Sequence, residues 1–151
     1  MRSGLPDGDG VVYKILGSMK KIFFLAFTSY LFCLASCEKD EGKLPNIAFN
    51  TGAGYTAADK IVAKSTDIKI GIIASKAEDK DVLKTFDGSR SYDGAAATSF
   101  ISESLSGSQG DNYSKDVTVT TRNQAGIEKY TFTVVNRDGL TNSVTLTLTV
   151  Q

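Results

Sequence analysis

The chain has 151 residues, about one domain, and balances 17 lysines and arginines against 17 aspartates and glutamates. This balance leaves no basic field for the phosphates of a nucleic acid, so nucleic acid is excluded as a partner. The chain has no histidine, which excludes Ser-His and Cys-His nucleophile pairs and structural zinc sites built from Cys and His.

Residues 1–18 do not suit an export signal. Pro6, Asp7 and Asp9 precede the first cationic pair, Lys20 and Lys21, whereas an export signal begins with its positive charges. We therefore expect translation to start at Met19 and residues 1–18 to be a miscalled start.

Residues 19–36 are typical of a signal peptide. Lys20 and Lys21 are followed by an apolar run over residues 22–35, which has about the length of a signal-peptide core. A transmembrane helix needs about 20 apolar residues, so this run is short for a membrane span. Beyond Cys37 the sequence turns abruptly polar.

The end of this run carries a resemblance. Leu34, Ala35, Ser36 and Cys37 resemble the lipobox of bacterial lipoproteins. The resemblance implies a lipid on the Cys37 thiol, cleavage before Cys37 and a membrane as partner. Two or more acyl chains anchor stably, since each buried methylene contributes about 0.8 kcal/mol. The alternative is an ordinary secretory signal or a hydrophobic helix with an incidental cysteine.

We expect residues 37–44 to be the lipidated cysteine followed by a charged tether. The acidic stretch 38–41 is similar to signals that send lipoproteins of Bacteroidota to the outer face of the outer membrane. We expect that location, facing the cell exterior, although a charged tether is also simply a solvated linker. From Glu38 to Leu44 the tether spans at most about 25 Å when extended.

Residues 45–151 predict an all-β fold. Short alternating apolar runs are separated by Gly, Asn, Asp and Ser, with no apolar repeat at helical spacing. The length is close to the roughly 100 residues of an immunoglobulin-like domain. We expect an antiparallel β-sandwich of about seven strands in meander order, over residues 47–49, 68–72, 82–86, 99–105, 115–121, 130–134 and 144–150.

The last two strands are the clearest. Apolar residues alternate with threonine in both, which indicates one buried and one solvated face. The turn residues 136–139 between them predict a hairpin. Earlier in the chain, Pro45 suits an edge strand, and Gly71 marks a close approach or a bulge.

This ending resembles the immunoglobulin-like domains of small Bacteroidota lipoproteins, over residues 126–134 and 136–139 and the threonine-rich last strand. Tyr130 is placed like the tyrosine-corner residue of such domains, and Phe132 stands where antibodies carry their second cysteine. The sandwich would then be held by packing without a disulfide. Alternatively, Tyr130 packs without the corner hydrogen bond.

Four residues are candidates for ligand binding: Arg90, Tyr92, Asp93 and Tyr113. Tyrosines with Asp or Asn beside them in loops suit stacking on a sugar ring, but they equally suit capping the core. Strands that alternate in direction place residues 88–97 and 122–127 at the end away from the tether. Arg90 and Tyr92 are thus better placed than Tyr113 to meet an outside partner.

The sequence gives little support for catalysis or for metal binding. No acidic residue lies in an aromatic context that indicates a buried acid. Two clusters of oxygen ligands, at residues 78–81 and 111–116, suit calcium, but solvated turns explain both, and we expect no metal and no cofactor.

We expect a non-enzymatic, lipid-anchored cell-envelope protein whose domain is an interaction or spacer module for another envelope protein. The alternative is a glycan-binding surface lipoprotein accessory to polysaccharide capture.

Overall fold

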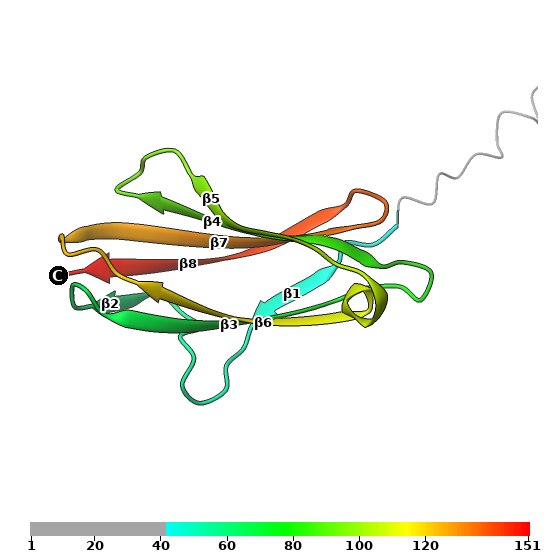
Figure 1. Ribbon diagram of the computed structural model, residues 1–151, viewed down its shortest axis with the longest axis horizontal. Coiled ribbons are helices and arrows are strands. Elements are labelled where there is room, and N and C mark those ends of the chain that lie inside the picture. Colours follow the sequence, from blue (N-terminus) through cyan, green and yellow to red (C-terminus); the bar gives the residue numbers. More distant parts are fainter. Residues whose placement is uncertain (1–41) are drawn as a thin grey trace, which may run out of the picture. The chain divides into compact units, whose positions relative to one another are not determined.

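The computed structural model describes residues 42–151, which form an all-β sandwich of two sheets. Figure 1 shows the two layers edge on, with β4, β5, β7 and β8 in one layer and β1, β3 and β6 in the other. The start at Met19, the signal peptide and the lipid attachment at Cys37 lie outside the described residues.

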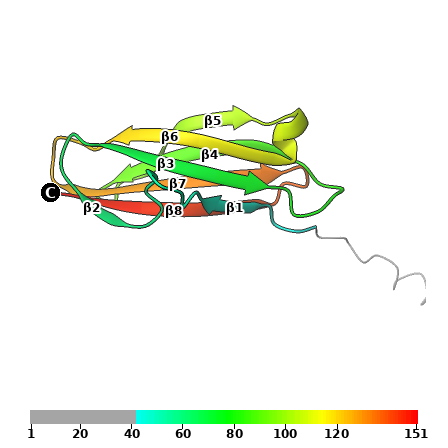
Figure 2. The same ribbon diagram turned by 90° about the horizontal axis from the view of Figure 1, so that it is seen from below.

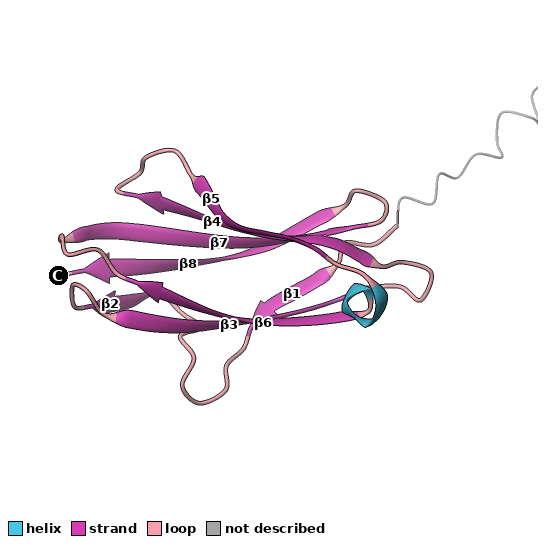
Figure 3. Cartoon of the chain, viewed as in Figure 1, coloured by secondary structure: helices cyan, strands magenta, loops and turns pink. Residues whose placement is uncertain are grey.

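The strands divide into a sheet of three and a sheet of five. The first has the order β1-β3-β6, with β1 (Asn46–Phe49), β3 (Asp67–Ser75) and β6 (Asn112–Thr120). The second has the order β2-β8-β7-β4-β5, with β2 (Lys60–Val62), β4 (Leu83–Tyr92), β5 (Thr98–Ser104), β7 (Gly126–Asn136) and β8 (Thr141–Val150). The one helix drawn within residues 42–151 is a 3-10 turn, η2 (Gly107–Gly110), between β5 and β6 (Figure 3).

All seven predicted strands exist, and the hairpin of β7 and β8 around residues 136–139 is confirmed. The structure adds β2, which the sequence analysis missed. β2 has three residues and pairs in parallel with β8, so the expected purely antiparallel sandwich is wrong at this pair. A strand of this length is too short to display the alternation by which strands are recognised.

The meander order is also wrong. Among consecutive strands only β4–β5 and β7–β8 pair with each other, whereas the other five connections between β1 and β8 cross between the sheets. Alternation in a sequence shows which face of a strand is buried, but it does not show which neighbour the strand pairs with. The pairing order therefore had to come from the structure.

The core lies between the two sheets and contains the predicted alternating residues. Tyr130, Phe132 and Val134 of β7 are at most 1% exposed, and they face a β3 whose Ile70 and Ile72 are fully buried. Phe132 also contacts Phe86 at 6.1 Å and Phe49 at 6.4 Å between ring centroids. Residues 42–151 contain no cysteine, so packing holds the sheets together.

The glycine in β3 allows a close approach, as predicted. A Cβ at Gly71 would lie 2.7 Å from Asn50 Cβ and 2.8 Å from Tyr55 Cδ1. The Tyr55 hydroxyl donates to Asp116 at 2.8 Å, and Lys69 pairs with the same carboxylate at 2.8 Å. The loop between β1 and β2 is thereby fastened to the outer face of the three-stranded sheet.

The sandwich has two ends that differ in what they carry. The chain enters at the proximal end, where Asn136 Nδ2 donates to the Lys43 carbonyl at 3.3 Å and where the connections at residues 76–82, 105–111 and 137–140 lie (Figures 1 and 2). The distal end carries the connections at residues 93–97 and 121–125 and the chain terminus. The prediction that residues 88–97 and 122–127 lie at the end opposite the chain entry is confirmed. It holds although the strand order differs, because connections that cross between the sheets also reverse the chain direction.

Candidate functional site

Three of the four predicted ligand residues lie together at the distal end. Arg90 and Tyr92 end β4, and the Arg90 guanidinium lies 5.7 Å from the Tyr92 ring centroid. Asp93 and Gly94 have φ values of 51° and 80°, and the Ala95 N–H donates to the Tyr92 carbonyl at 2.9 Å. An Asp-Gly pair favours such a turn, in which both central residues have positive φ.

Arg122, which the sequence analysis did not single out, is the centre of this cluster. Its Nη1 lies 2.8 Å from Asp93 Oδ2, and its guanidinium lies 4.3 Å from the Tyr92 ring centroid. Asp93 Oδ1 also accepts the Ile127 N–H at 2.7 Å. The Arg122 hydrogen bond lowers the pKa of Asp93, and Asp93 in turn raises the pKa of Arg122, so both are ionised over a wide pH range.

A buried acid, Glu128, completes the cluster from β7. Its exposed fraction is 0%. Its Oε1 accepts the Arg122 backbone N–H at 2.8 Å and the Arg122 Nε at 3.0 Å, and its Oε2 accepts the Tyr130 hydroxyl at 2.7 Å. A buried carboxylate is tolerated when a cation and hydrogen-bond donors surround it, as here.

The expectation of no buried acid was therefore wrong, and the sequence contained the signal. Glu128 has the same parity along β7 as Tyr130, Phe132 and Val134, and these residues point inward. Period-2 alternation places every second residue on one face, so the pattern predicts an inward Glu128 once the strand is extended to Gly126.

Tyr130 makes a different hydrogen bond from that of a tyrosine corner. Its hydroxyl donates to the Glu128 side chain, whereas the corner motif uses an upstream backbone group. Burial, followed by the hydrogen bond to Glu128, raises the pKa of Tyr130 well above its ordinary value. The neutral phenol is thus a fixed donor to the buried carboxylate.

The cluster is closely packed. A Cβ at Gly126 would collide with the Asp93 carboxylate and lie 2.8 Å from Arg122 Nη2. That Nη2 is buried with no hydrogen-bond partner among the described residues. The side chains of the cluster therefore connect the β4–β5 turn to the β6–β7 connection.

Tyr113 is not a loop residue. It lies in β6, is 6% exposed, and contacts Phe86 at 5.0 Å between ring centroids. Its hydroxyl donates to Glu103 Oε2 at 2.6 Å, and the same carboxylate pairs with Lys115 at 2.6 Å. Of the two readings left open for Tyr113, the burial agrees with packing on the core and not with sugar stacking, because β6 begins at Asn112 and its alternation turns Tyr113 inward.

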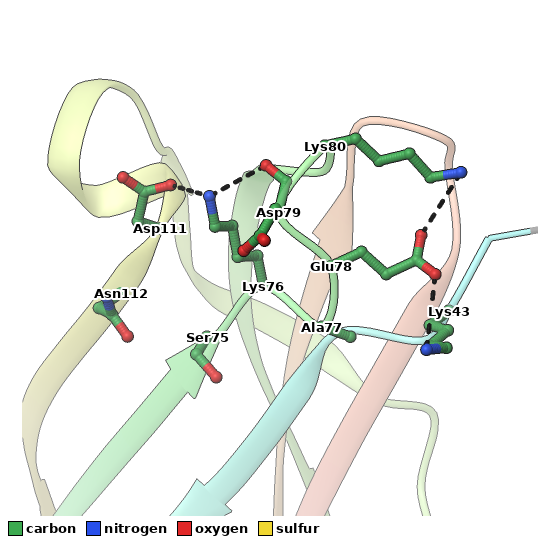
Figure 4. A pocket seen from close by; sticks show the side chains of 9 residues that line it. All are labelled: Lys43, Ser75, Lys76, Ala77, Glu78, Asp79, Lys80, Asp111 and Asn112. Carbon is green, nitrogen blue, oxygen red and sulfur yellow. Dashed lines mark hydrogen bonds and ion pairs between the residues drawn. The ribbon is translucent and has the colours of Figure 1, made fainter.

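A groove of about 690 Å³ opens at the proximal end (Figure 4). Lys76 lies within it, 2.8 Å from Asp111 Oδ1 and 3.2 Å from the Asp79 carbonyl. Glu78 pairs with Lys43 at 3.7 Å and with Lys80 at 3.8 Å. The cations and acids of the groove are thus largely matched with one another.

The two candidate calcium clusters are occupied by other contacts. Asp81 is 2% exposed and accepts Asn136 Nδ2 at 2.6 Å, while Asp116 is bound by Lys69 and Tyr55. Within residues 42–151, no three acidic, His or Cys side chains gather closely enough to hold a metal ion. Nor does that part of the chain contain a helix long and apolar enough to cross a membrane.

Comparison with known proteins supports the fold and nothing finer. No family model matches the chain, and no curated protein matches it. A variant of the superoxide reductase (neelaredoxin) from Ignicoccus hospitalis has a TM-score of 0.50 at 10% identity, over 77% of this chain and 86% of that one. A CARDB domain from Pyrococcus furiosus, solved with two metal ions, has a TM-score of 0.43 at 14% identity, over 73% and 91%. The chain is therefore an immunoglobulin-like β-sandwich, and these likenesses carry no activity over to it.

Proposed function

We propose that the chain is a lipoprotein of the cell envelope, anchored through Cys37, whose sandwich is a non-catalytic interaction or spacer module. We place it on the outer membrane, facing the exterior, on the strength of the acidic stretch 38–41. The partner class is another envelope protein.

The observation that carries the proposal is the packing of the distal cluster. Arg122 pairs with both Asp93 and Glu128, and Glu128 accepts the Tyr130 hydroxyl, so the charged groups of the cluster are bound to one another. Such a cluster stiffens the end of the sandwich, which suits an interaction or spacer module. Glycan capture is not proposed, because Tyr113 is buried and Tyr92 packs against Arg122.

The anchor is tested by fractionation of cells that carry Cys37→Ser. We expect the protein to leave the membrane fraction or to accumulate unprocessed. Cys33→Ser is the matched control, since Cys33 lies in the same apolar run four residues earlier and has no role in lipid attachment. Equal membrane retention and processing of both variants would contradict the proposal.

The surface location has its own test. Protease added to intact cells should digest the sandwich of an exterior-facing protein and spare a periplasmic marker. Protection of the sandwich until the outer membrane is opened would place it inside and would leave the lipid anchor itself untouched.

A further inference from the structure

The outer face of the five-stranded sheet is bare. No strand or helix of residues 42–151 packs on it (Figure 1), and its outward side chains are mainly hydroxyls. They are Thr85, Ser89 and Ser91 of β4, Thr131 and Thr133 of β7, and Ser143, Thr145, Thr147 and Thr149 of β8. We call this the hydroxyl face.

Two charges stand near the middle of the hydroxyl face, and neither has an opposite charge within residues 42–151. Asp87 accepts a hydrogen bond from the Ser102 hydroxyl at 2.7 Å and pairs with no cation. Lys129 is exposed and pairs with no acid. In the sheet register Asp87 of β4 lies beside Thr133 of β7, and Lys129 of β7 lies beside Ser91 of β4. One further outward pair, Ser89 and Thr131, separates the two charges.

We propose that the hydroxyl face packs against the same face of a second copy, about a twofold axis that crosses β7 at Thr131 and runs across the strands. Residues equally spaced about Thr131 then face each other. Ile127, which is 52% exposed, meets the half-buried Val135 of the second copy. Lys129 meets Thr133 of the second copy, one strand from its Asp87.

The charges select this orientation. An axis along the strands over β7 would set Lys129 directly against Lys129 of the second copy, and like charges placed together at an interface repel each other. With the axis across the strands, each Lys129 lies near an Asp87, and both otherwise unmatched charges gain partners. A twofold interface requires this kind of self-complementarity.

A hollow in the face receives the partner's acid. It has a volume of about 220 Å³, and two cations, Arg90 and Lys129, line it together with Ser89, Ser91, Ala95, Ala97 and Thr131. Because Asp87 and Ser91 are equally spaced about Ser89, the partner of Thr131 in the register, Asp87 of the second copy faces this hollow. Its carboxylate would then lie beside Lys129.

The area suffices for a stable pair. At about 3.3 Å per residue and about 4.8 Å between strands, the sheet presents roughly 600–800 Å² on this side. Specific interfaces bury about 600–1,000 Å² on each partner. Two twisted sheets packed within about 30° of antiparallel fit face to face, and the two Gly42 ends then lie at opposite ends of the pair.

The first test is a charge swap in the full chain, purified in detergent and followed by analytical ultracentrifugation. Lys129→Glu and Asp87→Lys should each raise the dimer dissociation constant about tenfold, because each sets like charges together. The double variant Lys129→Glu with Asp87→Lys should restore the wild-type value. Lys64→Glu, off the face, is the control. A wild-type chain that is monomeric throughout, or a double variant no tighter than the singles, would overturn the proposal.

The second test fixes the orientation with a short bismaleimide, in a full chain that carries Cys33→Ser and Cys37→Ser. Thr131→Cys should cross-link to itself, because it lies on the axis. Ile127→Cys should not cross-link to itself, yet it should cross-link to Val135→Cys in a mixture. Self-cross-linking of Ile127→Cys would show parallel packing and overturn the proposed axis. Neither test depends on the lipid anchor, since the face is the same without it.

Discussion

At the scale of single residues, the distal end depends on Glu128. An ionised carboxylate removed from water is expensive unless it is paired and hydrogen-bonded. Glu128 has no exposed surface and meets this condition with three donors, two from Arg122 and one from Tyr130. Arg122 then extends the network to Asp93 and so to the β4–β5 turn.

We predict that Glu128→Ala lowers the free energy of unfolding by about 3 kcal/mol, because it leaves the Arg122 Nε, the Arg122 backbone N–H and the Tyr130 hydroxyl without their acceptor in a buried site. Glu128→Gln should cost less, since the amide oxygen still accepts from Arg122. Urea denaturation measures both. The exposed Lys64→Ala is the control, with an expected change within about 0.5 kcal/mol. A Glu128→Ala chain as stable as Lys64→Ala would show that the network contributes nothing.

The buried tyrosines predict how stability depends on alkaline pH. Burial and a carboxylate neighbour raise the pKa of Tyr113 and of Tyr130 in the folded chain, whereas unfolded tyrosines ionise near pH 10. This contribution to stability is therefore fully present below about pH 10 and is lost as the pH rises further. The free energy of unfolding, measured in urea, should fall above pH 10, and Tyr113→Phe should make the fall shallower. An unchanged slope in Tyr113→Phe would contradict the assigned cause.

At the scale of elements, β3 and the loop between β1 and β2 act together. Gly71 is the point at which the Tyr55 ring contacts the strand, and Asp116 of β6 holds the Tyr55 hydroxyl from the next strand. The hydrogen bond from Lys69, followed by that from Tyr55, lowers the pKa of Asp116. The loop is thus part of the sheet's outer surface.

We predict that Gly71→Ala destabilises the chain by about 1–3 kcal/mol, the usual cost of overpacking. In a chain that already carries Tyr55→Ala the same substitution should cost less, because only the contact with Asn50 Cβ then remains. Urea denaturation of the four chains of this double-mutant cycle measures the coupling. Equal costs in both backgrounds would mean that Tyr55 does not constrain Gly71.

The elements also show where sequence patterns succeed. Strands with several alternating residues, such as β7 and β8, were predicted because the alternation shows which side of the strand is buried. The sequence analysis missed the short β2 and the crossings between the sheets, and it placed Tyr113 in a loop instead of a strand. Pairing partners and strand ends depend on contacts between distant parts of the chain, which a local pattern does not contain. The site follows the same rule. Arg90, Tyr92 and Asp93 are near one another in sequence, whereas Arg122 and Glu128 join them through the fold.

At the scale of the whole molecule, the two ends of the sandwich differ in structure. The chain enters at the proximal end beside a groove of matched charges, and the distal end is closed by the Arg122 cluster. Between them lies the hydroxyl face, which offers an extended surface with almost no charge. We propose that the module acts by contact through its faces.

The central claim is that Cys37 becomes the lipid-bearing first residue of the mature protein. Intact mass spectrometry of the protein purified from the membrane of its own cells tests this claim most directly. We predict a mass equal to residues 37–151 plus a diacylglyceryl group and one further acyl chain, with no peptide from residues 1–36. A mature chain that begins elsewhere, or that begins at an unmodified Cys37, would contradict the account.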